Sequence, residues 1–149
     1  GSVTAMPSSE VYNAMSSKVL DAAVTSSTSL LSFRLYEHAK SVTTARGKSF
    51  WYMFEPLLMG KSAFNALTPE QQKIVLEVGA SLEQFGMEAA KADDVKLADV
   101  FGKAGVKVAD MSQEQFDKWV AVAKASSWQD FEAKVKDGAV WLKLATDVK

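Results

Sequence analysis

One segment limits the possible folds more than any other, the run Thr68-Pro69-Glu70-Gln71 and the residues that follow it. Thr68 suits the N-cap of a helix, Pro69 suits the first helical position, and Gln71 completes a capping box. Apolar residues then recur at helical spacings between positions 74 and 89, and no later proline interrupts the chain. This pattern predicts one long helix that begins at this capping box.

The predicted helix is too long for a small domain. With Gly102 and Gly105 as its stop, it would run to about Phe101 and measure on the order of 50 Å at 1.5 Å per residue. Two interpretations remain open. The helix breaks near Ala92-Asp93-Asp94, or it continues and spans two lobes of a larger fold.

The remaining local patterns predict a front of mixed short strands and helices and a helical end. Ser8 is expected to cap a first helix, with Glu10 near its positive end. Ser112 to Gln115 forms a second capping box, which opens a helix that breaks at Ser126-Ser127, and Gly138 separates a last segment. The other expected elements are short strands at 19–24, 42–44 and 106–108, a buried strand at 57–59, and helices at 29–39 and 61–66.

Composition excludes several classes of protein. The 149 residues are 48% hydrophobic, which fits one globular domain or a compact piece of a larger protein. The 17 basic and 18 acidic residues balance, so no nucleic-acid footprint is expected. No apolar run reaches the roughly 18 residues of a membrane span. There are no cysteines, so disulfides and thiolate metal sites are excluded. Gly1-Ser2 indicates a mature or trimmed chain with no signal peptide.

Catalytic residues are scarce. His38 is the only histidine, and Glu37 beside it would point about 100° away on a helix, so His38 is interpreted as a surface or packing residue. The carboxylates at positions 93, 94 and 99 are interpreted as a solvated helix face and not as metal ligands. We therefore expect no enzyme activity, no metal and no cofactor.

A cluster of aromatic residues, Phe50-Trp51-Tyr52 with Phe54, is the more informative feature. Core packing is the simpler reading, but alternate side chains of a strand face opposite ways, so two rings could line a cleft. Glu55 within this apolar run would need a partner if it were buried.

Three stretches of the sequence resemble segments of a known protein family. They are MPSSEVYNAMSSKVLDAAVTSS, SFRLYEHAKSVT and FWYMFEPLLMGKSAFNALTPEQQKIV, and AGVKV follows them in the same order. Together they resemble the C-terminal half of the solute-binding proteins of TRAP transporters, the tripartite ATP-independent periplasmic transporters. The resemblance implies a helix-dominated α/β fold, the second half of a two-lobed binding protein, with a long inter-lobe helix after Thr68. Residues of about 1–50 would belong to the second lobe, and those of about 51–149 would form a strand, the long helix and C-terminal helices packed on the first lobe.

The resemblance also implies a site. Its ligand-binding positions correspond to Ser8, Thr25, Ser26, Phe50, Trp51, Phe54 and Glu55. Asp21 matches a family aspartate, whereas Lys18 and Ala22 stand where the family has glycine. The ligand would be a small organic acid, the partner a membrane permease, and the location the periplasm.

The arginine that clamps the ligand carboxylate in this family would lie before Gly1, and neither Arg34 nor Arg46 matches its position. The resemblance therefore implies that this chain alone lacks the main clamp, which the other half of the fold would supply. The alternative is a fragment that self-associates as an element-exchanged dimer with a second copy and binds no ligand. An enzyme that uses His38 ranks last.

Overall fold

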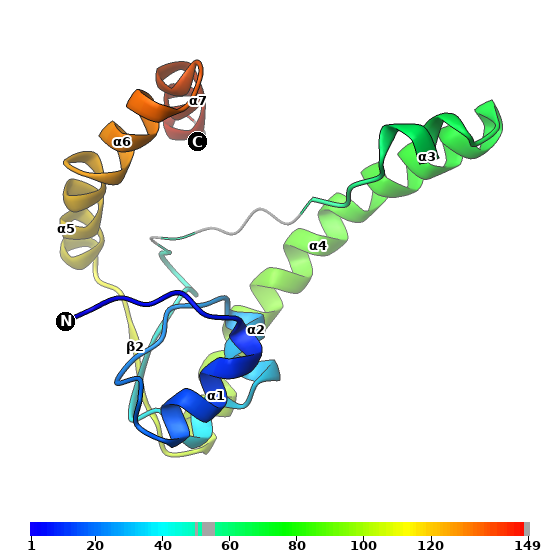
Figure 1. The fold of residues 1–149 in the computed structure, drawn as a ribbon. Coiled ribbons are helices and arrows are strands. Elements are labelled where there is room, and N and C mark those ends of the chain that lie inside the picture. The colour runs from blue at the N-terminus through cyan, green and yellow to red at the C-terminus, as the bar shows by residue number, and fades with distance from the viewer. Residues whose placement is uncertain (50, 52–55, 148–149) are drawn as a thin grey trace.

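The computed structural model describes residues 1–49, 51 and 56–147, and the statements below concern these residues. The chain order is α1 (Ser8–Ser16), α2 (Ser27–Ser32), a 3-10 turn η1 (Leu35–Glu37), β1 (Ser41–Thr44), α3 (Lys61–Asn65), α4 (Pro69–Lys103), β2 (Lys107–Asp110), α5 (Gln113–Lys124), α6 (Ser127–Lys134) and α7 (Gly138–Thr146). Figure 1 shows α4 running away from the body that contains α1, α2 and the strands, with α3 beside its far end.

Helix α4 continues without a break for 35 residues, so the alternative in which it breaks near positions 92–94 is excluded. The capping box is present as predicted. The Thr68 side chain accepts from the backbone of Gln71, and the Gln71 side chain accepts from the backbone of Thr68. The helix stops before Gly105, whose φ of 81° favours glycine. The second capping box, at Ser112 and Gln115, is also confirmed.

The strands β1 and β2 form one parallel pair, in which Ser41 faces Lys107 and Thr44 faces Asp110. The last turns of α4 lead directly into β2 and pack against both strands. This pair confirms the extended segments expected near 42–44 and 106–108.

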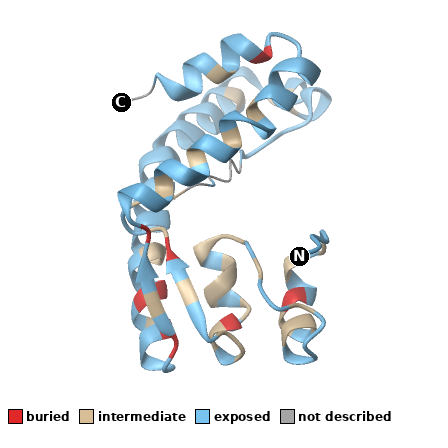
Figure 2. Ribbon diagram, turned by 90° about the vertical axis from the view of Figure 1, so that its left-hand side faces the viewer, coloured by how far each residue is buried: buried red, intermediate tan, exposed pale blue. Residues whose placement is uncertain are grey.

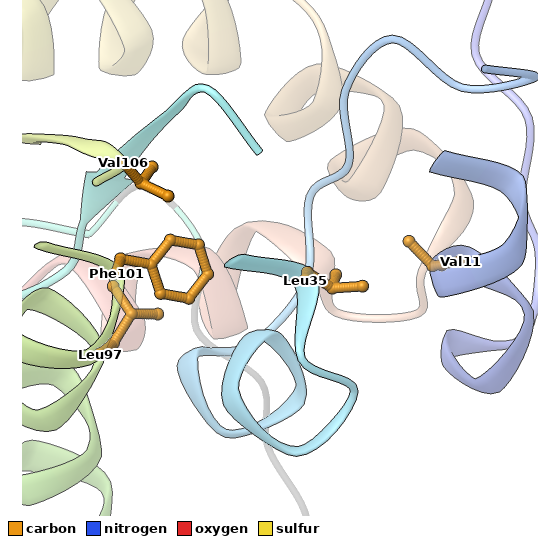
Figure 3. Close-up of a cluster of buried hydrophobic side chains, with 5 residues drawn as sticks. All are labelled: Val11, Leu35, Leu97, Phe101 and Val106. Atoms are coloured by element: carbon orange, nitrogen blue, oxygen red, sulfur yellow. The ribbon is translucent and has the colours of Figure 1, made fainter. Parts of the chain in front are cut away.

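The core is small and lies at the root of α4. Its buried members are Val11, Leu35, Leu97, Phe101 and Val106. Figure 3 shows Leu97, Phe101 and Val106 grouped together, with Leu35 next to them and Val11 beyond Leu35. The ring of Phe101 also meets Tyr36 edge-on at 5.7 Å between centroids. Figure 2 shows that buried residues gather in this body, while most of α4 to α7 is exposed.

Two predicted elements are wrong. The segment 19–24 is not a strand, because the Val19 and Leu20 amides donate to the Ala14 carbonyl at 2.9 and 3.1 Å and no described strand pairs with the residues that follow. The helix predicted over 29–39 is interrupted at Arg34, whose left-handed backbone (φ 53°) ends α2 and starts η1.

Three further expectations need correction. The segment Leu57–Met59 is not a buried strand, because Leu57 and Leu58 are more than four-fifths exposed and no described strand pairs with them. Ser8 does not cap α1. It is the first helical residue, and Pro7 holds the N-cap position, where its carbonyl accepts from the Glu10 amide at 2.9 Å.

The interpretation of positions 93 and 94 as a solvated face is also wrong. Ser27 donates to Asp94 at 2.5 Å, and Thr28 donates to Asp93 at 2.7 Å. These two hydrogen bonds attach the start of α2 to the last third of α4, so both carboxylates are half-buried and hydrogen-bonded. Asp99, by contrast, is exposed as expected.

Candidate functional site

A cavity of about 1330 Å³ lies between β1 and the segment that connects α1 to α2. Its walls include residues 20–30 and 37–45 without interruption, and α4, β2 and α5 contribute two or three residues each. Thr25, Ser26 and Trp51 line this cavity, so the structure brings three of the predicted site residues to one place.

The other predicted site residues are placed differently. Ser8 starts α1 and is not among the cavity's lining residues, so its role stays a prediction. Phe50, Phe54 and Glu55 lie outside the described residues, and their role also stays a prediction.

The side chains of Thr25 and Ser26 differ in their hydrogen bonds. The Ser26 hydroxyl oxygen accepts from the Ser29 amide at 3.2 Å and caps α2. The Ser26 hydroxyl also lies 3.0 Å from that of Ser29. Thr25 makes no side-chain hydrogen bond with the part of the chain that is described, so its hydroxyl is available to a ligand. The capping role of Ser26 was not anticipated from the sequence, although Ser-x-x-Ser before a helix is a signal that could have shown it.

Trp51 lies on the stretch after β1 and is 41% exposed. The Ser49 hydroxyl donates to the Trp51 carbonyl at 2.6 Å, and this bond holds the backbone of Trp51 in place. A half-exposed tryptophan in a cavity wall presents a flat apolar surface to a small ligand.

The carboxyl ends of β1 and β2 carry a polar group that the sequence did not reveal. Thr44 is 3% exposed, and its hydroxyl donates to the Asp110 carboxylate. The Arg46 guanidinium donates to both oxygens of Asp110, at 3.1 and 2.8 Å. The bonds from Thr44 and then Arg46 hold the pKa of the Asp110 carboxyl below its ordinary value. The carboxyl ends of parallel strands are the usual place for a ligand in an α/β sheet.

Glu37 and His38 also line the cavity, and Tyr12 contacts both from outside the lining. Tyr12 donates to Glu37 at 2.6 Å, which raises the pKa of the tyrosine hydroxyl and lowers that of the glutamate carboxyl. His38 packs edge-on against Tyr12 with 4.6 Å between ring centroids. Its Nε2 atom is buried with no hydrogen-bond partner among the described residues, which fits a packing role.

The described residues show neither a metal-binding cluster nor a membrane-spanning helix. They contain no group of three or more histidine, cysteine or acidic side chains placed to hold a metal ion. None of their helices combines the length and the apolar character that a membrane crossing requires.

The chain belongs to the bacterial extracellular solute-binding proteins of family 7, whose family model matches residues 1–134. This match defines the class of protein and confirms the resemblance to TRAP solute-binding proteins. The identity to individual relatives is also high. The chain is 47% identical over 143 residues to a solute-binding protein of Albidiferax ferrireducens, and 29% identical over 127 residues to one of a Sulfitobacter strain.

A solved structure shows the same fold. The chain matches a TRAP periplasmic solute-binding protein from Rhodoferax ferrireducens, solved with bound malonate, at a TM-score of 0.91 and 46% identity over 98% of this chain. The predicted fold class, a helix-dominated α/β half of a binding protein with a long helix after Thr68, is thereby confirmed. The chain spans 46% of that structure, 42% of the Albidiferax protein and 37% of the Sulfitobacter protein. The division near residue 50 between lobes stays a prediction.

Proposed function

We propose that these 149 residues form one wall of the ligand cleft of a periplasmic TRAP solute-binding protein. The protein binds a small organic acid and delivers it to the membrane permease. Residues of about 1–50 belong to the second lobe, and the long helix α4 connects the lobes. The role is one of binding and not of catalysis.

One observation carries the proposal, namely that Thr25 and Trp51 share a cavity with the carboxyl ends of β1 and β2. Thr25 offers a hydroxyl that has no partner among the described residues, and Trp51 offers an apolar surface, while Thr44 and Asp110 form the polar end of the strands. The wall as a whole mixes hydroxyl and charged side chains with alanine, valine and leucine side chains, and convergent polar groups beside apolar surface can orient a small polar ligand. The malonate in the Rhodoferax structure supports a carboxylate ligand.

The carboxylate clamp comes from outside these residues in this proposal. Arg46 is held by Asp110 through two hydrogen bonds, and Arg34 forms an ion pair with Glu37. Releasing Arg46 would leave Asp110 without its charged partner. Bidentate pairing of arginine with a ligand carboxylate is hard to replace with lysine. The remaining lobe of the fold is therefore the source of the clamp.

Titration calorimetry with malonate and other small mono- and dicarboxylates tests the proposal. It should use both the natural polypeptide that contains these residues and the 149-residue chain alone, with intact mass fixing the length of the former. Thr25→Val removes a hydroxyl but keeps the shape. Loss of a hydrogen bond to a charged ligand should cost about 1.5–3 kcal/mol, roughly a 10- to 150-fold weaker Kd. Trp51→Ala should also weaken binding by about tenfold or more.

Matched controls are available in the chain. Thr4→Val and Trp141→Ala alter exposed residues that do not line the cavity, and they should leave Kd unchanged. Absence of binding by the natural polypeptide to every acid tested, or equal effects of the site and control variants, would refute the proposed site.

A second candidate function is self-association without ligand binding, as an element-exchanged dimer. The observation that favours it is the apolar stripe of α4, where Ile74, Val78, Leu82 and Phe85 are 42–68% exposed. Exposed apolar patches of this kind mark association surfaces. Light scattering of the 149-residue chain would show a dimer, and Phe85→Glu should dissociate it. A well-folded monomer at all concentrations would exclude this candidate.

A further inference from the structure

Two acidic residues of α4 hold the start of α2. Ser27 and Thr28 are the first two residues of α2, and they donate to Asp94 at 2.5 Å and to Asp93 at 2.7 Å. Hydrogen bonds to a carboxylate are shorter than those between neutral groups and about twice as strong. Two neighbouring donors thus meet two neighbouring acceptors, and the bonds join residues that lie 67 and 65 positions apart in the chain.

The bond between Ser27 and Asp94 differs from its neighbour in its surroundings. It is partly buried, whereas the bond between Thr28 and Asp93 is exposed to solvent. A hydrogen bond that is shielded from water is electrostatically stronger than an exposed one. Asp94 also lines the cavity together with Ser27, and Asp93 is not among the lining residues. Asp94 is therefore the carboxylate that ties α4 to the cavity wall.

Helix α2 needs this attachment, because little else fixes its place. It has six residues, and none of them is buried. A helix of this length is not stable without tertiary contacts. Leu30 and Leu31 pack against the core cluster but are only partly buried. The position of α2 on α4 therefore depends on these two apolar side chains and on the two carboxylates.

Thr25 is held from one side only, and that side leads to Asp94. Residues 21–25 make no backbone hydrogen bond with the rest of the described chain, and the nearest fixed point before them is the Leu20 amide, which donates to the Ala14 carbonyl at 3.1 Å. After Thr25, Ser26 caps α2, and Ser27 is bonded to Asp94. A displacement of Ser27 would consequently move Thr25, which lies two residues away.

We infer that Asp94 is a positioning residue of the ligand site, which acts through Ser27 to hold the Thr25 hydroxyl in place in the cavity wall. The inference rests on the proposed function, since it requires that Thr25 meets a ligand. Asp94 is not the group that meets an acid, because like charges repel and its Oδ1 atom already accepts from Ser27. Asp93 supports the same segment more weakly through Thr28.

The sign of the effect on affinity separates positioning from direct electrostatics. If Asp94 affected an acidic ligand through its charge alone, its removal would relieve repulsion and tighten binding. If Asp94 positions Thr25, its removal weakens binding, and loss of the Ser27 hydroxyl weakens binding in the same way. The second variant leaves the charge of Asp94 in place, so it reports on the hydrogen bond by itself.

Titration calorimetry of the natural polypeptide with malonate as the probe measures these effects. Asp94→Ala and Ser27→Ala should each raise Kd about fivefold or more, and the double variant should be no weaker than the single ones, because both remove the same bond. Ser27→Thr keeps the hydroxyl and should stay within about twofold of the parent. Asp99→Ala is the matched control, since it removes an equal charge from an exposed position of α4 outside the cavity lining.

A double-mutant cycle with Thr25 distinguishes positioning from a general structural role. In a Thr25→Val background the hydroxyl that needs positioning is absent. Asp94→Ala should therefore change Kd by no more than about twofold in that background, although it weakens binding in the parent. A variant that only destabilises the fold would have the same effect in both backgrounds. Circular dichroism checks that each variant keeps the helical content of the parent.

A measurement without ligand keeps the outcome separate from that of the proposed function. Methyl relaxation in threonine-labelled protein gives an order parameter for the Thr25 side chain. Asp94→Ala and Ser27→Ala should lower this order parameter toward that of the exposed Thr4. The order parameter of the buried Thr44 should not change.

Several results would overturn the inference. An unchanged Thr25 order parameter would show that Asp94 does not hold this segment. Tighter malonate binding by Asp94→Ala would assign the residue a direct electrostatic effect, and equal losses with and without the Thr25 hydroxyl would assign it a structural role. If the natural polypeptide does not bind malonate, the result counts against the proposed function, and the order parameters alone decide whether Asp94 positions Thr25.

Discussion

Replacement of Phe101 by alanine tests whether the root of α4 holds the strand-bearing body together. Phe101 is 1% exposed and belongs to the same buried cluster as Leu97 and Val106, beside which Figure 3 shows it. It also meets the ring of Tyr36 edge-on, with 76° between the ring planes. The side chain therefore links α4, the start of β2 and η1.

The size of the effect follows from burial and from the small size of this core. Truncation of a buried phenylalanine to alanine costs about 3–5 kcal/mol, because apolar contact is lost and a cavity remains. The edge-on pair with Tyr36 contributes about 0.5–1.5 kcal/mol of this loss. The five buried residues have partly buried apolar side chains around them, which can refill only part of the space, so we expect a decrease of roughly 4 kcal/mol in the free energy of unfolding.

Urea denaturation followed by circular dichroism measures this change, and the same helix offers a control. Phe85 lies on α4 but is 68% exposed, so Phe85→Ala should change the free energy of unfolding by no more than about 0.5 kcal/mol. A loss below about 1 kcal/mol for Phe101→Ala, or equal losses for both variants, would show that the core at the root of α4 does not stabilise the body.

Two further predictions concern the strands and the end of α1. The pKa of Asp110 is lowered in the folded protein, so its stabilising contribution is present above the unfolded value of about 3.9 and is lost as the pH falls through the folded pKa. In the Asp110→Asn variant, the free energy of unfolding should therefore fall less steeply below about pH 4 than in the parent protein. Equal pH dependence of the free energy of unfolding in both proteins would contradict this. Lys18 has a left-handed backbone with φ of 60°, so Lys18→Gly should raise the melting temperature through a gain of about 1 kcal/mol. A lower melting temperature would argue against backbone strain at this position.

Local signals were readable from the sequence because their partners lie a few residues apart. The capping boxes at Thr68 and Ser112 each close over three residues, and both are present. The start and the reach of the long helix followed from the absence of proline and from its apolar spacing, whereas its continuity through positions 92–94 was one of two alternatives until the structure showed it. The interruption at Arg34 could not be read, because nothing in its side chain requires a left-handed backbone.

Features that depend on distant partners were missed. Thr44 and Asp110 are separated by 66 residues and meet only because β1 and β2 pair in parallel. Ser27 and Asp94, 67 residues apart, meet only because α2 crosses α4. Residues 19–24 failed as a strand for a related reason, since strand assignment needs a partner and not composition alone. Thr25 and Trp51 were found through the family resemblance, and the cavity brings them together.

Helix α4 has a mechanical consequence that follows from where it is held. The buried residues of α4, Leu97, Ala98 and Phe101, all lie in its last two turns. The α2 hydroxyls donate to Asp93 and Asp94, just before these turns. The free arm, from Pro69 to Asp93, is about 36 Å long at 1.5 Å per residue. A tilt of about 5° at the attachment would move the tip near α3 by roughly 3 Å over that length. The same tilt moves Phe101, which lines the cavity, by only about 1 Å, so a small rotation at the root of the helix becomes a larger displacement at its tip.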